Sequence, residues 1–295
     1  MRKKNKIIVT GGAGFVGTNL IKLLLSKTKH QIISIDDYSS GKKSNEIKNI
    51  RVRYIKSKTV NISKVIKNTK GIKTVFHFGE FARIYQSFLK MSECIDSNSV
   101  GSNAVFNFCL KNKIKLIYSA TSASLGNHGN DKNLSPYAFS KSKNLELLEN
   151  LKKWFNFKYE VIYFYNVYGP HQICEGEMAT VMGIFEHHYR RGKPLPVVKP
   201  GTQSRRFTHI NDTVNICYLA WKKNLCRHYS IANKKTYSIL KIAKMFKSKI
   251  NFLPKRQGER YASSLLNTNL SNKMHKHFGK INLENYIEDF ISKNH

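Results

Sequence analysis

Tyr137 and Lys141 are the residues best placed by type and spacing for acid–base chemistry. They are four residues apart, so their side chains would share one face of a helix. A neighbouring ammonium favours the ionised form of a phenol, which lets a tyrosine exchange protons near neutral pH. The spacing alone is not specific in so basic a chain. Five other tyrosines have a lysine four residues later: Tyr38, Tyr54, Tyr189, Tyr218 and Tyr237.

The surroundings of Tyr137 distinguish it from those five. The segment 113–119 predicts a strand, and the hydroxyls of Thr121 and Ser122 follow at its carboxyl end. Pro136 then begins a helix predicted over 137–154. Ligands bind outside the carboxyl ends of parallel strands in open α/β sheets. We therefore expect Thr121, Tyr137 and Lys141 to form a catalytic set, with Ser122 as the alternative hydroxyl.

A glycine-rich turn near the start of the chain predicts a dinucleotide site. Gly11, Gly14 and Gly17 follow the apolar run 7–9 and precede a helical pattern of leucines and isoleucine over 20–25. A turn between a strand and a helix lets backbone N–H groups and the helix dipole approach a pyrophosphate. Phe15 and Val16 lie within the same turn and belong to the predicted cofactor site.

The acidic pair Asp36 and Asp37 ends a second predicted strand over 31–35, and Asp36 comes 25 residues after Gly11. That offset is close to the ~20 residues at which an acidic side chain meets the ribose hydroxyls of a dinucleotide. A carboxylate there repels a 2′-phosphate, so the pattern favours NAD over NADP. Lys42 and Lys43 follow closely and act against that preference.

Segments typical of strands and helices alternate through the first two thirds of the chain. Strands are predicted over 7–9, 31–35, 52–55, 73–78, 113–119 and 159–164, and helices over 92–111 and 137–154. This alternation predicts an α/β protein with a Rossmann-type, doubly wound parallel sheet. From about Gly176 the elements become shorter. We expect an NAD-binding domain over 1–175 and a smaller substrate-binding lobe over 176–295, with returns to the main sheet.

Composition excludes several classes of protein. No apolar run reaches the ~18 residues of a membrane span, and the short run after the basic start is no signal peptide. Five cysteines without a Cys-x-x-Cys pair favour a reduced, cytoplasmic setting and argue against a zinc site. The net charge of +33 suggests a polyanionic partner, but its basic residues are spread along the whole chain. We therefore expect a generally basic surface, no specific nucleic-acid site and no metal.

Several motifs in order resemble the extended short-chain dehydrogenase/reductases of the nucleotide-sugar epimerase/dehydratase family, of the UDP-glucose 4-epimerase type. The resemblance runs from Ile7 to about Arg260. Its motifs are the loop 10–17, the segment 36–41, His77-Phe78-Gly79-Glu80 with Ser87, the Thr121, Tyr137 and Lys141 set, Tyr165-Asn166-Val167-Tyr168-Gly169-Pro170, the segment 201–207, and Pro254-Lys255-Arg256-Gln257-Gly258-Glu259.

The resemblance implies roles for further residues. Phe78 and Gly79 would contact the cofactor, and Asn166 would touch the sugar nucleotide. Arg205 and Arg256 would hold the substrate's diphosphate, as rigid guanidinium forks suit phosphate. The family's commonest substrates are UDP-linked glucose, galactose or their N-acetyl forms. The helices 92–111 and 137–154 correspond to a pair that builds a dimer interface in this family, which implies a homodimer.

Departures from the family pattern are also visible. Glu80 and Arg83 replace small residues beside the expected nicotinamide and sugar. Buried charge requires pairing, so these two side chains either form an ion pair or contact the substrate. The segment 56–61 lacks the family's aspartate that contacts adenine, and the loop between Thr121 and Tyr137 is shorter than usual.

The residues after Thr121 favour one reaction within the family. Dehydratases carry an Asp-Glu pair there and decarboxylases a Glu, whereas this chain has Ser122 and Ala123. Both reactions are disfavoured unless Glu80 substitutes from another strand. We therefore expect an NAD-dependent epimerase that inverts C4 of a UDP-hexose through a 4-keto intermediate. An NAD(P)H-dependent keto-sugar reductase or a dehydratase remains the alternative, and a non-catalytic RNA-binding protein of this fold is the alternative of another class.

Overall fold

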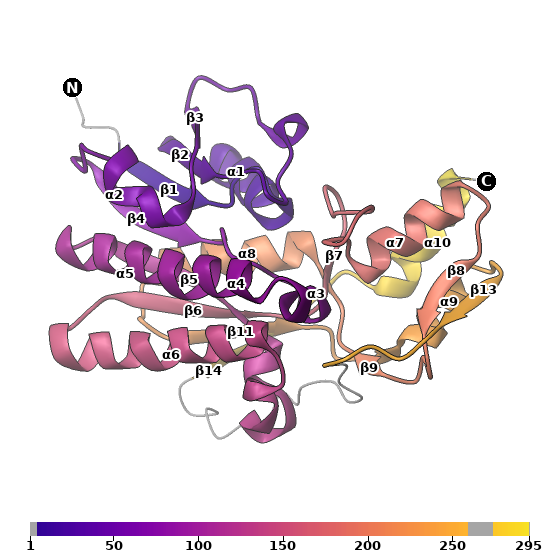
Figure 1. Cartoon of the computed structure of the whole chain (residues 1–295). Helices are drawn as coiled ribbons and strands as arrows, with labels where there is room; N and C mark the ends of the chain where they lie inside the picture. Colours follow the sequence, from indigo (N-terminus) through magenta and orange to yellow (C-terminus); the bar gives the residue numbers. More distant parts are fainter. Residues whose placement is uncertain (1–4, 259–273, 295) are drawn as a thin grey trace.

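An eight-stranded parallel sheet organises the molecule (Figure 1). The structure is a computed structural model and describes residues 5–258 and 274–294. The strand order is β14-β11-β6-β5-β4-β1-β2-β3, and all seven pairings are parallel. The strands are β1 (Lys6–Thr10), β2 (Gln31–Asp36), β3 (Val52–Lys56), β4 (Ile72–His77), β5 (Lys115–Thr121), β6 (Tyr159–Phe164), β11 (His228–Ala232) and β14 (Met274–Phe278). The predicted Rossmann-type fold is confirmed.

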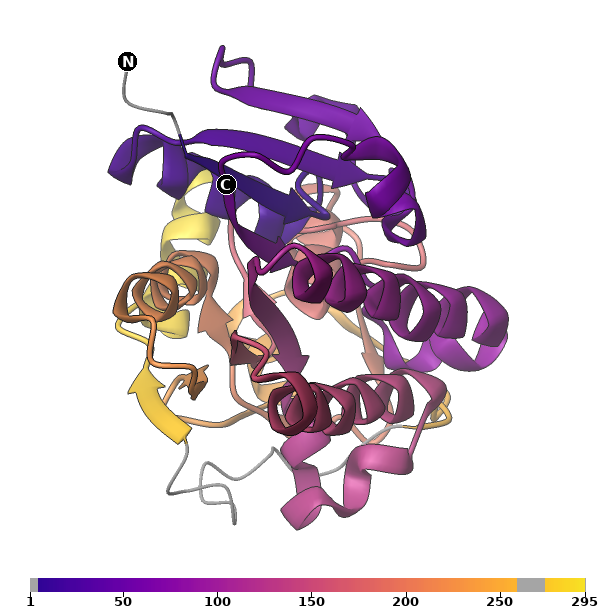
Figure 2. The same ribbon diagram turned by 90° about the vertical axis from the view of Figure 1, so that its left-hand side faces the viewer.

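Helices cover both faces of this sheet, as a parallel sheet requires (Figure 2). One face packs against α5 (Ser102–Lys111) and α6 (Pro136–Phe155), and the other against α1 (Phe15–Lys27) and α8 (Ile210–Lys223). The central strands are therefore buried along nearly their whole length, including six of the seven residues of β5. Those buried apolar runs are why the strands could be predicted from the sequence.

The predicted long helix over 92–111 is continuous but not uniform. It comprises α4 (Met91–Ile95), a π-helical segment (Asp96–Gly101) and α5. A π-turn inserts a residue into a helix and often occurs beside a functional site. Here Asp96, Ser97 and Gly101 line the main cavity of the molecule.

Short elements complete the part of the fold around the sheet. They are α2 (Ile62–Val65), α3 (Ile84–Leu89), and short 3₁₀ helices over Lys43–Asn45 and Thr59–Asn61. A longer 3₁₀ helix over Ser122–Asn133 connects β5 to α6. Two small ladders pair β7 (Val167–Tyr168) with β10 (Thr208–His209), and β9 (Ser204–Arg205) with β12 (Tyr237–Ser238).

A second group of elements lies beyond the carboxyl ends of the strands, at the right of Figure 1. It contains α7 (Val181–Arg190), β8 (Leu195–Val198), α9 (Ile239–Met245), β13 (Ile250–Leu253) and α10 (Leu283–Lys293). Its core is separate and rich in aromatic rings, such as Phe185, Phe246 and Phe290. The chain returns to the main sheet through β11 and β14, as expected, while the domain boundary at 175/176 stays a prediction. Among the described helices, none is long and apolar enough to cross a membrane.

Candidate active site

A cavity of about 1200 Å³ lies between the carboxyl ends of the strands and the second group of elements. Every residue predicted to bind a cofactor, bind a substrate or act in catalysis lines it. These residues are Gly11, Gly14, Phe15, Val16, Gly17, Asp36, Asp37, Phe78, Gly79, Glu80, Arg83, Thr121, Ser122, Tyr137, Lys141, Asn166, Arg205 and Arg256. The fold thus brings together residues 245 positions apart in sequence, from Gly11 to Arg256; their individual roles stay predictions.

At two glycines of the turn after β1, a side chain would collide with neighbouring backbone atoms. Gly11 has a φ of +70°, and a Cβ there would lie 2.8 Å from the backbone nitrogen of Gly79. A Cβ on Gly17 would lie 2.0 Å from the carbonyl oxygen of Gly11. The following helix, α1, has neither a side-chain cap nor an acidic residue in its first turn. Its first N–H groups have no partner within the helix, so the turn fits a pyrophosphate.

Asp36 ends β2 at the rim of the same cavity, beside the glycine turn. Its carboxylate accepts hydrogen bonds from the backbone nitrogens of Ala13 (2.9 Å) and Tyr38 (2.8 Å). Burial raises the pKa of this carboxyl, and these backbone donors counteract the rise. A carboxylate held at this edge has the chemistry that ribose hydroxyls require.

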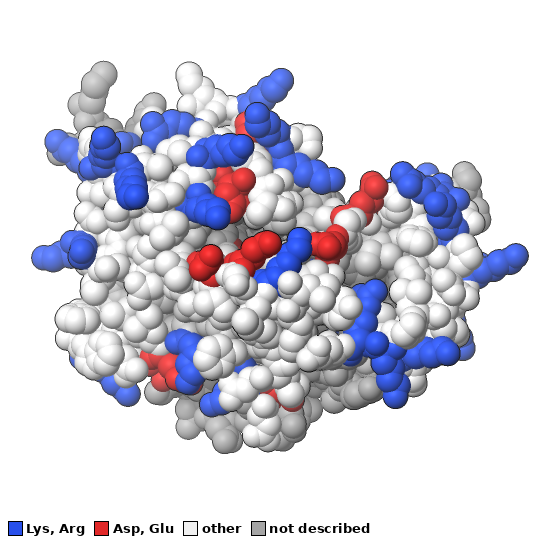
Figure 3. Space-filling model, viewed as in Figure 1, with Lys and Arg blue, Asp and Glu red and all other residues white. Residues whose placement is uncertain are grey.

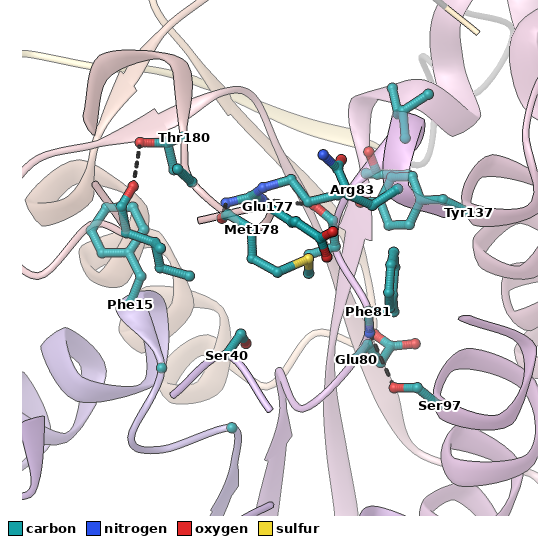
Figure 4. Close-up of a pocket in the computed structure, with 18 of the residues that line it drawn as sticks. Phe15, Ser40, Glu80, Phe81, Arg83, Ser97, Tyr137, Glu177, Met178 and Thr180 are labelled. Carbon is teal, nitrogen blue, oxygen red and sulfur yellow. Dashed lines mark hydrogen bonds between the residues drawn. The ribbon is translucent and has the colours of Figure 1, made fainter. Parts of the chain in front are cut away.

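Thr121 and Tyr137 approach the cavity from neighbouring elements. Thr121 is the last residue of β5, and its hydroxyl oxygen accepts a hydrogen bond from the backbone nitrogen of Ala123 (3.2 Å). Its hydroxyl proton is therefore left to donate. Ser135 caps α6 and Pro136 opens it, which places Tyr137 in the first turn. The ring of Tyr137 points into the cavity (Figure 4).

Lys141 lies one turn further along α6 and is nearly fully buried, with 4% of its side chain exposed. Its ammonium forms an ion pair with Glu80 and donates to the carbonyl oxygen of Ser119 (2.5 Å). It also lies 4.7 Å from the centre of the Tyr118 ring. The partners of Lys141 therefore come from β5 and from the segment that follows β4.

The sequence left two roles open for Glu80, an ion pair or a contact with the substrate. In the structure its carboxylate forms an ion pair with Lys141. Only 2% of its side chain is exposed, and besides Lys141 it accepts hydrogen bonds from the side chains of Ser102 (2.7 Å), Tyr118 (3.1 Å) and Asn144 (3.2 Å). The alternative of an ion pair between Glu80 and Arg83 is wrong. The carboxylate of Glu80 is held by side chains of α5, β5 and α6, whereas the guanidinium of Arg83 reaches the carbonyl oxygen of Met178.

Arg83 extends into the cavity beside Tyr137 and the loop that precedes α7 (Figure 4). Its guanidinium donates to the carbonyl oxygens of Ala82 (2.7 Å) and Met178 (2.5 Å), and its Nε has no partner. Burial lowers the pKa of this guanidinium, and proximity to Tyr137 acts in the opposite direction. No carboxylate among the described residues pairs with Arg83.

The residues predicted to hold the substrate's nucleotide come from later segments of the chain and line the same cavity. Asn166 has a φ of +30° and donates to the carbonyl oxygen of Arg206 (3.0 Å). Arg205, at the end of β9, is 8% exposed, and Arg256 lies 5.3 Å from the centre of the Tyr85 ring. Glu259, the last residue of that motif, and Arg260, at the end of the resemblance, lie outside the described residues.

Charge is distributed unevenly around this site. Figure 3 shows basic side chains around the edge of one face and a group of acidic ones across its centre. Four acidic residues line the cavity besides Asp36 and Asp37: Glu80, Glu93, Asp96 and Glu177. Within the described ranges, no three His, Cys, Asp or Glu side chains gather in a way that could hold a metal ion.

Sequence reasoning missed the polar side chains behind Lys141. The side chains of Ser102 (α5), Tyr118 (β5) and Asn144 (α6) donate hydrogen bonds to Glu80. The ring of His77 (β4) is linked to Glu80 through the hydroxyl of Ser102. None of the four carries a sequence pattern that predicts a functional role. No spacing of residues in the sequence predicts this cluster. The one indication is that Glu80 is a charged residue in a segment expected to be buried.

Comparisons with known proteins agree with this geometry. The model of the NAD dependent epimerase/dehydratase family matches residues 7–232. An ADP-L-glycero-D-manno-heptose-6-epimerase of Brachyspira hyodysenteriae is 29% identical over 225 residues, which cover 71% of this chain and 70% of that protein. An uncharacterized UDP-glucose epimerase of Bacillus subtilis, YtcB, is 27% identical over 281 residues, covering 86% and 87%.

Solved structures show the same fold. A UDP-glucose 4-epimerase from Thermotoga maritima, determined with UDP-glucose, is 23% identical and superimposes with a TM-score of 0.84 over 97% of both chains. A UDP-glucose 4-epimerase from Thermus thermophilus, in complex with NAD, is 20% identical, with a TM-score of 0.82 over 98% of both chains.

Proposed function

The chain belongs to the NAD-dependent epimerase/dehydratase family, and from this we propose that it inverts C4 of a UDP-linked hexose through a transient 4-keto sugar. The observation that supports the proposal is one shared cavity, which Thr121, Tyr137, the glycine turn, Arg205 and Arg256 all line. The epimerases among the relatives support sugar epimerisation in general.

NAD is the cofactor of this family. The glycine turn and the start of α1 would hold its pyrophosphate, and Asp36 with Asp37 its ribose hydroxyls. Phe78 and Gly79 would border it at the end of β4. When bound, NAD supplies the reversible acceptance and return of a hydride.

Tyr137 is the proposed acid–base residue. It takes the proton of the sugar hydroxyl as that carbon is oxidised, and it returns a proton when the carbon is reduced on its other face. Thr121 retains a hydroxyl proton and would donate it to the developing ketone oxygen. Ser122 is buried beside Thr121 and completes this wall of the cavity.

Arg205, Arg256 and Asn166 are proposed to anchor the nucleotide and its diphosphate. Their guanidinium groups would hold the charged end of the substrate while the sugar turns over beside Tyr137. Binding energy from this remote part of the substrate then serves the reaction at the sugar carbon.

Dehydration is the less supported alternative. Ala123 is buried and has no acid–base group. Glu80 was the residue that could have replaced the missing base, but its carboxylate accepts hydrogen bonds from Ser102, Tyr118 and Asn144 and pairs with Lys141. A carboxylate with four donors has little capacity left to take a substrate proton.

A product assay tests the proposal. The purified protein is denatured, and the released nucleotide is identified. The native protein is then incubated with UDP-glucose and with UDP-N-acetylglucosamine, and the C4-inverted sugars are quantified. We expect bound NAD, and inversion that falls at least ~100-fold in Tyr137→Phe.

Tyr218→Phe is the matched control. Tyr218 also lies on a helix with a lysine four residues later, but its ring meets Trp221 edge to face and does not line the cavity. Its variant is expected to retain activity. A preference for NADPH with net reduction of a keto-sugar, and no inversion, would replace the epimerase by a reductase.

The oligomeric state is part of the proposal. Leu89, Met91 and Phe139 are large apolar residues on α3, α4 and α6, with 43–65% of their surface exposed. A homodimer that buries this face accounts for them. Light scattering of the purified protein measures its mass, and a monomer at assay concentrations contradicts the proposal.

A further inference from the structure

A short turn over 176–179, just before α7, forms part of the cavity lining. The backbone nitrogen of Ala179 donates to the carbonyl oxygen of Gly176 (3.1 Å), and Gly176 adopts a φ of +78°. At the base of the turn, the backbone nitrogen of Thr180 donates to the carbonyl oxygen of Ile173 (2.9 Å). The Thr180 hydroxyl donates to the side chain of Gln172 (2.9 Å). The shape of the turn is therefore set by its own backbone and by the start of α7.

Arg83 joins this turn to the segment that follows β4. Its Nη1 donates to the carbonyl oxygen of Ala82 (2.7 Å), and its Nη2 donates to that of Met178 (2.5 Å). A guanidinium is planar and rigid, so these two bonds fix the backbone of Met178 relative to that of Ala82. The contacts indicate a role for Arg83 that differs from an ion pair with Glu80, because Arg83 links two segments of the chain.

The segment that carries Arg83 is itself bonded to the helix of Tyr137. Arg83 directly precedes α3, and the hydroxyl of Ser87 in α3 donates to the carbonyl oxygen of Ile84 (2.6 Å). The same hydroxyl oxygen accepts from the backbone nitrogen of Tyr137 (3.2 Å). The turn is thus connected, through Arg83 and α3, to the start of α6.

Met178 places its side chain inside the cavity. Figure 4 shows its thioether pointing into the pocket, where Phe81, Arg83 and Tyr137 are also drawn. The residue is partly buried, and its carbonyl oxygen is the group that Arg83 holds. An apolar side chain on a fixed backbone occupies space that a substituent of the substrate would otherwise fill.

A second contact reaches the same turn and is much more exposed. Lys90, between α3 and α4, pairs with Glu177 (2.6 Å), with 39% and 59% of their side chains exposed. Exposed pairs contribute little to stability. The Nε of Arg83, in contrast, is buried. Arg83 is therefore the contact that we expect to fix the turn.

We propose that Met178, held in place by Arg83, limits the size of the sugar that the cavity accepts. The inference rests on the proposed function, in which the sugar turns over beside Tyr137. A hexose that carries only hydroxyl groups should then bind better than one with an N-acetyl group, which is larger. Methionine is unbranched and adapts its shape, so we expect a preference of about tenfold rather than exclusion.

The binding of two UDP-sugars tests the inference. UDP-glucose and UDP-N-acetylglucosamine differ only in the substituent at C2. Isothermal titration calorimetry of the cofactor-loaded protein, in a Tyr137→Phe background that prevents turnover, gives both dissociation constants. We expect UDP-glucose to be preferred about tenfold, and Met178→Ala to reduce this preference to about twofold through tighter binding of the N-acetyl sugar.

A variant of Arg83 tests the link to the turn. Arg83→Met removes both hydrogen bonds and leaves Met178 in place, so the preference for UDP-glucose should also fall. The backbone amides of 176–179 should exchange with solvent about tenfold faster, because the turn opens more readily. Hydrogen exchange followed by mass spectrometry measures this without substrate and without activity.

Lys90→Met is the matched control, because it removes the exposed contact to the same turn. It should change neither the preference nor the exchange rates by more than about twofold. An equal acceleration of exchange in Lys90→Met and Arg83→Met would contradict the role given to Arg83.

The outcomes separate this inference from the proposed function. Equal affinity for the two sugars, or a preference that persists in Met178→Ala, would overturn the inference even if both sugars are inverted. A preference for UDP-glucose that depends on Met178, in a protein that inverts neither sugar, would uphold the inference and contradict the proposed epimerase.

Discussion

Two buried lysine–glutamate pairs lie at opposite ends of the same parallel sheet. Lys141 and Glu80 lie at the carboxyl end, with 4% and 2% of their side chains exposed. Lys115 and Glu160 lie at the amino end, where β5 and β6 begin, with 11% and 0% exposed and a distance of 2.7 Å between nitrogen and oxygen. By burial and composition the two pairs are nearly equivalent.

Their remaining hydrogen bonds differ. Glu160 accepts from the backbone nitrogens of Cys226 (3.0 Å) and Arg227 (2.7 Å), and Lys115 donates to Asn224 (2.6 Å). The amino-end pair therefore fastens the turn between α8 and β11 to the sheet. The carboxyl-end pair is held by side chains from three elements and lines the main cavity.

A buried ion pair therefore does not by itself identify a functional site. Removing one partner of such a pair is costly wherever it lies, because a charge is left unpaired. What distinguishes Lys141 and Glu80 is their position at the end of the sheet where the strands open onto a cavity. We therefore expect loss of either pair to lower the free energy of unfolding by a similar amount, and loss of the carboxyl-end pair alone to lower catalytic activity.

The largest expected effect comes from removing the ammonium of each pair in turn. Lys141→Met and Lys115→Met should each lower the free energy of unfolding by about 3–5 kcal/mol, because each leaves a buried carboxylate unpaired. Lys141→Met should also lower kcat at least ~100-fold, whereas Lys115→Met should retain it. Urea unfolding and the inversion assay measure both quantities. Loss of activity in a folded Lys115→Met protein would remove the distinction between the two ends.

An intermediate effect is expected from acid. The pKa of His77 is about 4 in the folded protein and 6.5 when unfolded. As the pH falls from 6.5 to 4, the unfolded chain binds this proton first, so folding stability decreases. The loss amounts to about 3 kcal/mol from His77 alone.

Urea unfolding between pH 7.5 and 4.5 measures this component as the difference between wild type and His77→Gln. His30, whose ring meets Trp221 edge to face near the amino end of the sheet, is the matched control. Burial lowers its pKa as well, but the ring is much less enclosed than that of His77. His30→Gln should therefore change the pH dependence less. An equal change in both variants would show that the buried cluster around Glu80 has no special sensitivity to acid.

The smallest effect is expected at an exposed pair beside the cavity. Lys90 and Glu177 are 39% and 59% exposed, and they join the turn between α3 and α4 to the loop before α7. Surface pairs contribute little to stability. Glu177→Gln should leave the melting temperature unchanged within error at physiological salt, as differential scanning calorimetry can check. A clear drop would mean that this contact, rather than the buried pairs, fixes the two parts of the molecule.

The sequence predicted the sheet and the glycine turn well because both are local. Buried parallel strands appear as apolar runs, and the observed β6 has the predicted bounds of 159–164. The turn requires glycine locally, since a Cβ on Gly17 would lie 2.0 Å from the carbonyl oxygen of Gly11. Neither feature depends on a distant part of the chain for its recognition.

The partners of charged side chains could not be predicted in the same way. Glu80 is adjacent to Gly79 of the cofactor segment and three residues before Arg83, yet it pairs with Lys141, 61 positions later. That choice depends on how β4, α5 and α6 pack side by side. The same holds for Arg83, whose guanidinium reaches the carbonyl of Met178, 95 positions away.

The sequence is therefore enough to predict the class of fold, the family and the residues that line the cavity, because strand patterns and glycine turns are properties of short segments. The ion pairs between charged side chains, in contrast, could be identified from the tertiary structure alone. An electrostatic partner is selected by distance and by the burial that strengthens the interaction, and both quantities exist only once the chain has folded.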